Sequence, residues 1–303
     1  MNQEPILIVG TGALATLFAA RLAERGHEIT MLGTWQAGLD ALARDGARLL
    51  DSDGRELACR VRVTRDPGRA RGAKVAFVLV KSWQTTRAAR QLAECLADDG
   101  LAVTLQNGLG NDNLLAEALG RERIALGVTT TGATLLGPGL ARAGGEGVVS
   151  LEAHPRLAVV EAALRRAHFQ VEVVADAQSL VWGKLVVNTA INPLTALLRV
   201  PNGELLKRPS ARVMMKALAG ETAAVASAQR VRLPFSNPGE AAESVARKTA
   251  ANHSSMFQDV RRGAPTEIDA ICGAVARAGK RHGVPTPVNR VCWQLVQAIA
   301  ARG

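Results

Sequence analysis

The sequence predicts two domains, an α/β domain over residues 1–175 and an all-α domain over residues 176–303. Short apolar runs alternate with helical patterns through the first half, and a glycine-rich turn follows the first of these runs. Strand-like runs disappear after about residue 176, where long helical patterns take over. With 303 residues and 48% hydrophobic content, the chain is large enough to bury two cores.

The first domain begins with a strand, a helix and a second strand. Residues 5–9 (PILIV) form a fully apolar run, which is typical of a strand buried on both faces of a parallel sheet. Apolar residues at helical spacing over 13–25 predict a helix that ends at Gly26, and a strand is expected at 28–32. A hairpin insertion (47–63), two further strands (75–80 and 101–105) and a helix between those strands (84–96) continue the alternation.

The end of the first domain and the whole second domain follow from the same patterns. Residues 124–151 are rich in Gly and Thr with short β-prone pieces, and a helix at 155–168 and a strand at 170–174 complete the domain. The helices expected in the second domain cover residues 180–198, 210–229, 238–250, 267–281 and 287–301.

Composition and charge argue against several classes of protein. The net charge of +10 comes from scattered basic residues, aromatic residues make up only 3%, and no nucleic-acid-binding signature is present. We therefore expect no nucleic-acid partner, although the positive field suits a small anionic ligand. No apolar run reaches the roughly 18 residues of a membrane helix, and the N-terminus lacks a signal-peptide pattern. The expected location is the cytoplasm, without a membrane partner.

Cysteine and histidine spacing predicts no metal site. The four cysteines are far apart and form no CxxC pair, so we expect reduced core thiols at Cys59, Cys95, Cys272 and Cys292. The histidines show no ligand or triad spacing, and we interpret all of them as structural: His27, His154, His168, His253 and His282.

The glycine-rich turn has the form Gly10-x-Gly12-x-x-Ala15 and lies between the first strand and the first helix. In this context the pattern predicts dinucleotide binding by a Rossmann-type domain, because glycines allow the pyrophosphate to approach and the helix N-terminus offers N–H donors. The expected cofactor-binding residues are Gly10, Thr11, Gly12, Ala13 and Leu14. A glycine turn that only permits close packing is the alternative.

The residues after the second strand normally reveal the choice of cofactor. An acid there binds the ribose 2′-hydroxyl of NAD, and an arginine binds the 2′-phosphate of NADP. This chain has Gly33-Thr34-Trp35, which contains neither. The missing acid leaves room for a phosphate, Thr34 is a candidate hydrogen-bond donor to it, and Trp35 either flanks the adenine or covers the sheet edge. NADPH is expected, with NADH left open.

A polar stripe crosses an otherwise apolar helix in the second domain. Lys184, Asn188 and Asn192 in KLVVNTAINPLTA follow each other at four-residue spacing and so lie on one helix face. Such a stripe is either a polar network between packed helices or the floor of a site. The chain contains no tyrosine, so a reductase built on it needs another proton donor.

Together these segments resemble the ketopantoate reductase family. The resemblance runs through GTGALA, VKSWQT, LQNGLGN, WGKLVVNTAINPLTA, PNGELL, SSMFQD, PTEIDAICGAV and HGVPTPVNR. It implies an oxidoreductase that uses NADPH to reduce a small 2-keto acid, 2-dehydropantoate (ketopantoate), to (R)-pantoate in pantothenate and coenzyme A biosynthesis. It also implies an active site in the cleft between the two domains.

The resemblance also implies roles for individual residues. Lys184 would be the general acid, Glu267 would orient the catalytic network or the substrate hydroxyl, and Asn107 would lie beside the nicotinamide. Substrate contacts would come from Asn188, Asn192 and Ser255, and Lys81 would belong to the cofactor or substrate side. An ammonium suits this chemistry because hydride addition builds negative charge on the carbonyl oxygen. Burial would lower the pKa of Lys184, while the charge of Glu267 would oppose that shift.

Several alternatives stay open at this stage. Family members commonly have a basic residue where this chain has Gly33-Thr34, so cofactor preference is undetermined. A related reductase of another 2-keto acid and a non-catalytic NADPH-binding sensor are the competing functions. The apolar helices of the second domain also leave a homodimer open.

Overall fold

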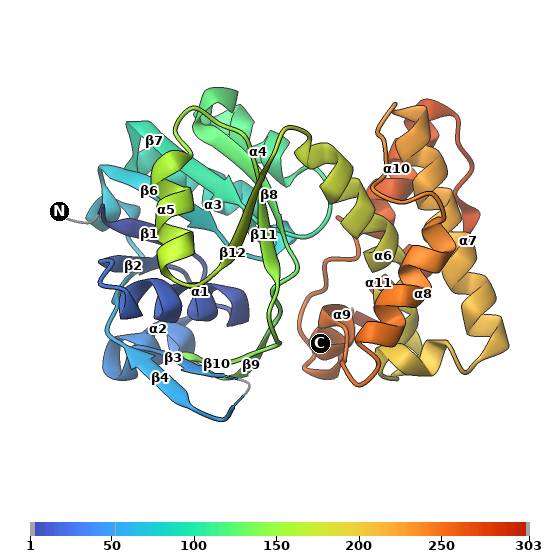
Figure 1. The fold of residues 1–303 in the computed structure, drawn as a ribbon, viewed down its shortest axis with the longest axis horizontal. Coiled ribbons are helices and arrows are strands. Elements are labelled where there is room, and N and C mark those ends of the chain that lie inside the picture. Colours follow the sequence, from blue (N-terminus) through green and yellow to red (C-terminus); the bar gives the residue numbers. More distant parts are fainter. Residues whose placement is uncertain (1–3, 52, 301–303) are drawn as a thin grey trace. The chain divides into compact units, whose positions relative to one another are not determined.

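The computed structural model describes residues 4–51 and 53–300, which form two compact units (Figure 1). One unit contains the chain up to Gln106 together with Asn111–Ala177. The other contains Asn107–Gly110 and the chain from Gln178 onward. The short segment Asn107–Gly110 therefore belongs to the helical unit, although the sequence range 1–175 had included it in the α/β domain.

The first unit is built on an eight-stranded sheet in the order β12-β11-β8-β7-β6-β1-β2-β5. All neighbouring strands are parallel except β8 and β11, which are antiparallel. This arrangement confirms the predicted α/β fold class. The strands are β1 (Ile6–Val9), β2 (Ile29–Leu32), β5 (Arg62–Thr64), β6 (Ala73–Val78), β7 (Leu96–Thr104), β8 (Ile124–Thr129), β11 (Val148–Glu152) and β12 (Gln170–Val174).

Helices cover both faces of this sheet (Figure 1). In β1, Ile6 and Ile8 belong to one hydrophobic core and Leu7 and Val9 to the other, which explains why the whole strand is apolar. The first core includes α1 (Ala13–Glu24) and α5 (Ala158–Arg166), and the second includes α3 (Thr85–Cys95) and α4 (Asn111–Leu119).

A smaller sheet packs against α1 in the order β4-β3-β10-β9. The antiparallel pair β3 (Ala47–Leu50) and β4 (Glu56–Cys59) confirms the predicted hairpin, whose turn includes Ser52 outside the described residues. The sheet is completed by β10 (Leu140–Ala143) and β9 (Ala133–Gly137) from the Gly- and Thr-rich region. The predicted insertion range ended at residue 63, but β5 (Arg62–Thr64) joins the main sheet beside β2.

Two helices of the first unit were missed from the sequence, namely α2 (Gln36–Asp45) and α4 (Asn111–Leu119). Both are short, with 10 and 9 residues, and their only large apolar residues are two leucines in α2 and three in α4. Short 3-10 helices fill several connections: η1 (Pro67–Ala70), η2 (Ser82–Gln84) and η3 (Arg121–Arg123).

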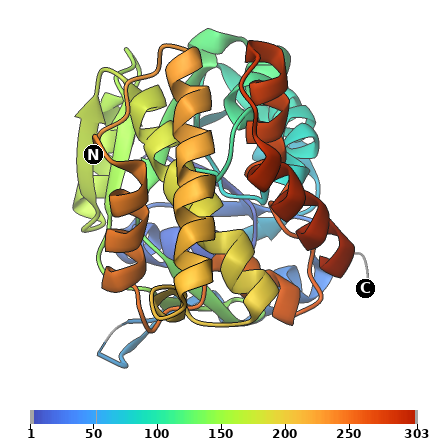
Figure 2. The same cartoon turned by 90° about the vertical axis from the view of Figure 1, so that its right-hand side faces the viewer.

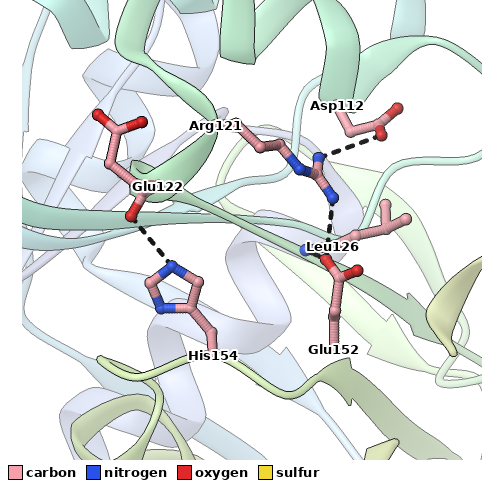
Figure 3. Close-up of polar contacts among 6 residues, drawn as sticks. All are labelled: Asp112, Arg121, Glu122, Leu126, Glu152 and His154. Atoms are coloured by element: carbon pink, nitrogen blue, oxygen red, sulfur yellow. Dashed lines mark hydrogen bonds and ion pairs between the residues drawn. The ribbon is translucent and has the colours of Figure 1, made fainter. Parts of the chain in front are cut away.

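A surface network joins η3 to the antiparallel edge of the sheet (Figure 3). Arg121 lies between Asp112 on α4 and Glu152 at the end of β11, with N–O distances of 3.3 and 3.1 Å. Nearby, Nε2 of His154 lies 3.0 Å from the carbonyl oxygen of Glu122. This histidine therefore has a structural contact, as the sequence predicted for it.

The second unit is all helical, which confirms the other half of the fold prediction. Its elements are α6 (Ala177–Leu198), η4 (Asn202–Leu205), α7 (Pro209–Ala228), α8 (Pro238–Lys248), α9 (Ser255–Arg261), α10 (Cys272–His282) and α11 (Pro287–Ala300). α7 packs against α8, α10 and α11 and runs through the middle of the view in Figure 2. The predicted end of the last helix at Ala301 lies outside the described residues.

Other sequence expectations concern cysteines and membrane helices. All four cysteines are free thiols, and Cys95, Cys272 and Cys292 are buried while Cys59 is half-buried. Burial raises the pKa of the Cys95 and Cys292 thiols to about 11. Within the described part of the chain, no helix is both long enough and apolar enough to cross a bilayer.

The carboxylate of Glu221, a half-buried residue on α7, binds the first turn of α11. Glu221 Oε1 accepts a hydrogen bond from the backbone N–H of Val288 at 2.8 Å, and its Oε2 accepts one from that of Asn289 at 2.9 Å. The side-chain amide of Asn289 donates to the same carboxylate at 2.9 Å. These bonds satisfy N–H groups that a helix N-terminus otherwise leaves unpaired and place negative charge at its positive end.

Replacing this carboxylate is expected to loosen the attachment of α11 to α7. Glu221→Ala removes the acceptor for three donors and should lower the free energy of unfolding by about 1–3 kcal/mol. Glu240→Ala is the matched control, because it also removes one glutamate, but from an exposed position in the first turn of α8. Denaturant unfolding followed by circular dichroism measures both variants, and equal losses would contradict the capping role.

Candidate active site

The polar stripe lies on α6, the first helix of the second unit. Lys184, Asn188 and Asn192 occupy one face of this helix at four-residue intervals. The intervening residues Leu185, Val186 and Ile191 are buried in the core of the unit. The helical prediction for this segment is thus confirmed, and the stripe is the polar edge of an otherwise apolar helix.

Hydrogen bonds from two threonines hold the second half of α6. Thr195 Oγ1 lies 2.7 Å from Ser254 Oγ, which joins α6 to the start of α9. Ser254 is buried and caps α9 by accepting a hydrogen bond from the N–H of Phe257 at 3.1 Å. Thr189 Oγ1 similarly lies 2.9 Å from Thr222 Oγ1 on α7. These contacts fix the rotation of α6 and hence the direction in which the stripe faces.

Glu267 lies in a turn before α10, and not on a helix as the sequence had suggested. The prediction of a helix over 267–281 was wrong at its start, because α10 begins at Cys272. Ile271 has φ −99° and ψ −94°, which interrupts the helical path. The carbonyl of Glu267 accepts from the N–H groups of Ala270 and Ile271, both at 3.1 Å, and this turn leaves the Glu267 side chain only 5% exposed.

The same turn binds the short segment that carries Asn107. Nδ2 of Asn107 donates to Oε2 of Glu267 at 3.3 Å, and the N–H of Leu109 donates to the carbonyl of Ala270 at 3.0 Å. Gly108 has φ +86°, and a Cβ there would lie 2.6 Å from the carbonyl oxygen of Ala270. Glycine at 108 therefore permits the close contact that brings Asn107 to Glu267.

The ammonium of Lys184 is perturbed by its surroundings. Burial lowers its pKa from 10.5 to about 8, and the negative charge of Glu267 partly opposes that shift. The residue as a whole is half-buried. The structure thus brings Lys184, Glu267 and Asn107 together and gives the lysine an acidity close to neutral pH, which suits a group that must donate a proton.

The two asparagines of the stripe have uncommitted side-chain amides. Asn192 is only 7% exposed and Asn188 is half-buried, yet neither amide hydrogen-bonds to any residue that the structure describes. Amides that are not committed to protein partners can donate and accept hydrogen bonds, so these two are good candidates for binding a ligand. Ser255 is the first residue of α9 and is exposed, in contrast to its buried neighbour Ser254.

The glycine-rich turn lies in the first unit and fits a pyrophosphate. A Cβ at Gly10 would lie 2.9 Å from the carbonyl oxygen of Leu79, whereas one at Gly12 would meet no atom within 4 Å. The N-terminus of α1 has no side-chain cap and no acidic residue in its first turn. Glycine at 10 thus permits the close approach of Leu79, which follows β6, and open space lies before Gly12. The N–H groups that begin α1 have no side-chain cap that would compete with a ligand.

The end of β2 lies against this turn. A Cβ at Gly33 would be 2.7 Å from Cγ2 of Thr11, so glycine is needed at this point too. Thr34 is half-buried, and its hydroxyl makes no hydrogen bond to another described residue. The ring of Trp35 packs over Gly38 of α2 and is 40% exposed. Gly33 and the uncommitted hydroxyl of Thr34 therefore lie next to the glycine-rich turn.

Lys81 lies in the first unit, after β6 and directly before η2. It is half-buried, and Gln106 braces the loop by donating from Nε2 to the carbonyl of Val80 at 3.0 Å and to Thr85 Oγ1 at 2.8 Å. Two positioning residues, Gln106 and Ser254, were not predicted from the sequence. A cap signal before α9 could have revealed Ser254, but only the tertiary structure reveals the contacts of Gln106.

No metal centre is evident among the described residues. Across residues 4–51 and 53–300, no cluster of three potential metal ligands occurs.

Comparison with known proteins covers both units. Residues 6–156 match the family described as "Ketopantoate reductase PanE/ApbA", and residues 176–300 match "Ketopantoate reductase PanE/ApbA C terminal". A 2-dehydropantoate 2-reductase from Halobacterium salinarum is 36% identical over 298 residues, which are 96% of this chain and 97% of the relative.

Two solved structures have nearly the same fold along the whole chain. A PanE/ApbA family ketopantoate reductase from Ralstonia eutropha JMP134 aligns with a TM-score of 0.92 at 30% identity, over 98% of this chain and 99% of its own. A D-mandelate dehydrogenase in a ternary structure with NADH and anilino(oxo)acetate aligns with a TM-score of 0.92 at 25% identity, over 98% of both chains.

The electrostatic coupling within the cluster predicts a measurable change. Because the charge of Glu267 raises the pKa of Lys184 against the effect of burial, Glu267→Gln should lower that pKa further below about 8. Titration of isotope-labelled lysine side chains by NMR measures the shift, with Lys184→Ala identifying the signal. Asp269→Asn removes an equal charge two residues away, and an equal shift in that variant would contradict a specific effect of Glu267.

Proposed function

The chain belongs to the ketopantoate reductase family, and we propose that it catalyses the NADPH-dependent reduction of 2-dehydropantoate to (R)-pantoate. In this proposal the first unit binds the dinucleotide and the helical unit supplies the catalytic and substrate-binding side chains. The observation that carries the proposal is the cluster of Lys184, Glu267 and Asn107, with the pKa of the lysine lowered to about 8 beside two uncommitted asparagine amides. The product is a precursor for pantothenate and coenzyme A.

The proposed reaction adds a hydride to the C2 carbonyl carbon of the keto acid. When bound, NADPH supplies that hydride and leaves as NADP⁺. The carbonyl π electrons move to oxygen, and Lys184 donates a proton to that oxygen to give the alcohol. The ammonium also stabilises the developing negative charge before the proton is transferred, because the two opposite charges lie in partly buried surroundings. Lys184 regains its proton from solvent after product release.

Glu267 and Asn107 have supporting roles in this scheme. The negative charge of Glu267 favours the protonated form of Lys184, because it opposes the effect of burial on the lysine pKa. Asn107 donates to Glu267 at 3.3 Å and fixes the direction of that carboxylate. We assign the nicotinamide end of the cofactor to the neighbourhood of Asn107 and the pyrophosphate to the turn at Gly10–Leu14.

The substrate is assigned to the face of α6 that carries the stripe. The amides of Asn188 and Asn192 both donate and accept hydrogen bonds, so they can bind the carbonyl, hydroxyl or carboxylate oxygens of a small keto acid. Ser255, which begins α9 next to Ser254, is assigned to the carboxylate region. The bond between Ser254 and Thr195 keeps this serine in register with α6. Lys81 supplies positive charge on the cofactor side.

A reductase of a different 2-keto acid is the second candidate. It is favoured by the structural similarity to a D-mandelate dehydrogenase whose structure contains NADH and anilino(oxo)acetate. Lys184, Glu267 and the amides would serve the same chemistry, because every 2-keto acid presents the same carbonyl beside a carboxylate. A panel of aliphatic and aryl 2-keto acids distinguishes the two, and a strong preference for an aryl substrate would overturn the assignment of 2-dehydropantoate.

The central experiment follows NADPH absorbance with 2-dehydropantoate as substrate. Lys184→Ala should lower kcat by roughly 10²–10⁴-fold while the protein still binds NADPH, because the proton donor is lost and the cofactor turn is intact. Lys207→Ala is the control, since Lys207 is exposed and pairs with Glu204. Full activity in Lys184→Ala would contradict the proposed role, and no turnover by the unmodified protein would contradict the proposed substrate.

The pH profile gives an independent check. Only the protonated form of Lys184 donates, so kcat should fall as the pH rises through about 8. Glu267→Gln should move this fall to lower pH because the variant favours the neutral amine. A profile that is flat between pH 7 and 10 would argue that another group supplies the proton.

A further inference from the structure

The end of β2 lacks a basic residue of its own, but a neighbouring strand reaches the same edge of the sheet. β5 pairs with β2 in parallel, with Leu32 opposite Thr64, and the N–H of Gly33 donates to the carbonyl of Thr64 at 3.1 Å. Parallel strands end at a common edge, so the residue after Thr64 emerges beside the residue after Leu32. That residue is Arg65.

Arg65 is held in place without being neutralised. Its Nη1 donates to Oε1 of Gln36, the first residue of α2, at 2.8 Å. The Gln36 amide in turn donates to the carboxylate of Asp40 at 2.6 Å. Arg65 is exposed and forms no ion pair with any residue in the described part of the chain. The guanidinium therefore retains its remaining donors for a ligand.

The place where Arg65 lies is the ribose end of the proposed cofactor site. Gly33 packs against Thr11 of the glycine-rich turn, and the uncommitted hydroxyl of Thr34 follows it. In this fold the adenosine ribose lies at the end of the second strand, beside the turn that binds the pyrophosphate. No acidic residue occupies positions 33–36, so nothing there competes for the ribose hydroxyls or repels a phosphate.

We propose that Arg65, with the hydroxyl of Thr34, binds the ribose 2′-phosphate of NADPH and sets the preference of this chain for NADPH over NADH. A guanidinium matches a phosphate with parallel hydrogen bonds, and its charge complements the phosphate dianion. The neighbouring strand β5 thus supplies the basic group that β2 lacks. The inference rests on the proposed use of a dinucleotide by the first unit but not on the identity of the keto acid.

The test measures nucleotide binding without turnover. Isothermal titration of the full-length protein compares 2′,5′-ADP, which carries the 2′-phosphate, with 5′-AMP, which lacks it. The unmodified protein should bind 2′,5′-ADP about 10–100-fold more tightly, as expected for charge-assisted hydrogen bonds to one phosphate. Arg65→Ala should remove most of this margin and leave the affinity for 5′-AMP unchanged. Arg65→Lys should restore part of it, because an ammonium keeps the charge but not the paired donors.

Arg62→Ala is the matched control. It removes the same charge from the same strand, but Arg62 is at the other end of β5 and lies 3.5 Å from Glu28. If Arg62→Ala lowers the preference for 2′,5′-ADP over 5′-AMP as much as Arg65→Ala does, the effect is general electrostatics and the proposal is overturned. An unchanged preference in Arg65→Ala would also overturn it. Equal binding of both nucleotides by the unmodified protein would also overturn it. In that case turnover of 2-dehydropantoate with NADH would support the proposed reaction with the other dinucleotide. No turnover with either dinucleotide would contradict the proposed reaction separately.

Discussion

The interaction on which the candidate site depends is the electrostatic coupling of Lys184 to the buried carboxylate of Glu267. Burial alone favours the neutral amine, which donates protons poorly to an alkoxide and leaves its charge unstabilised. Glu267 opposes that effect without eliminating it, and the outcome is a pKa of about 8. Glu267 is itself only 5% exposed, and the hydrogen bond from Asn107 helps to orient its carboxylate.

This requirement explains features of the backbone that would otherwise look incidental. The Asn107–Gly110 segment lies between β7 and α4 in sequence but packs with the helical unit. The positive φ of Gly108 and its close approach to Ala270 make that placement possible. Glu267 lies in a turn before α10. The backbone carbonyl of Glu267 accepts two hydrogen bonds in this turn, which fixes the position of the residue. The backbone geometry of Asn107–Gly110 and of the turn at Glu267 thus positions the carboxylate that acts on Lys184.

The polar side chains of α6 differ in whether the surrounding helices provide hydrogen-bond partners for them. Thr189 and Thr195 satisfy their hydroxyls within the helix and across to Thr222 and Ser254, so they stabilise the packing. The amides of Asn188 and Asn192 have no such partners among the described residues. These amides are available to a ligand, which is typical of residues in functional sites.

The sequence by itself determined the fold class, the glycine-rich turn and the stripe on α6, because each depends on local period and short spacing. It also located the hairpin at β3 and β4 and the change from strands to helices. Tertiary structure decided which distant groups meet: Asn107 with Glu267, Ser254 with Thr195, and Arg65 with Gln36 at the start of α2. The start of α10 and the helices α2 and α4 likewise escaped prediction, since one non-helical residue has no sequence signature and a short helix with few large apolar side chains is easily overlooked. Side-chain pairing across 29 to 160 residues depends on strand order and turn geometry, and neither of these has a local signature in the chain.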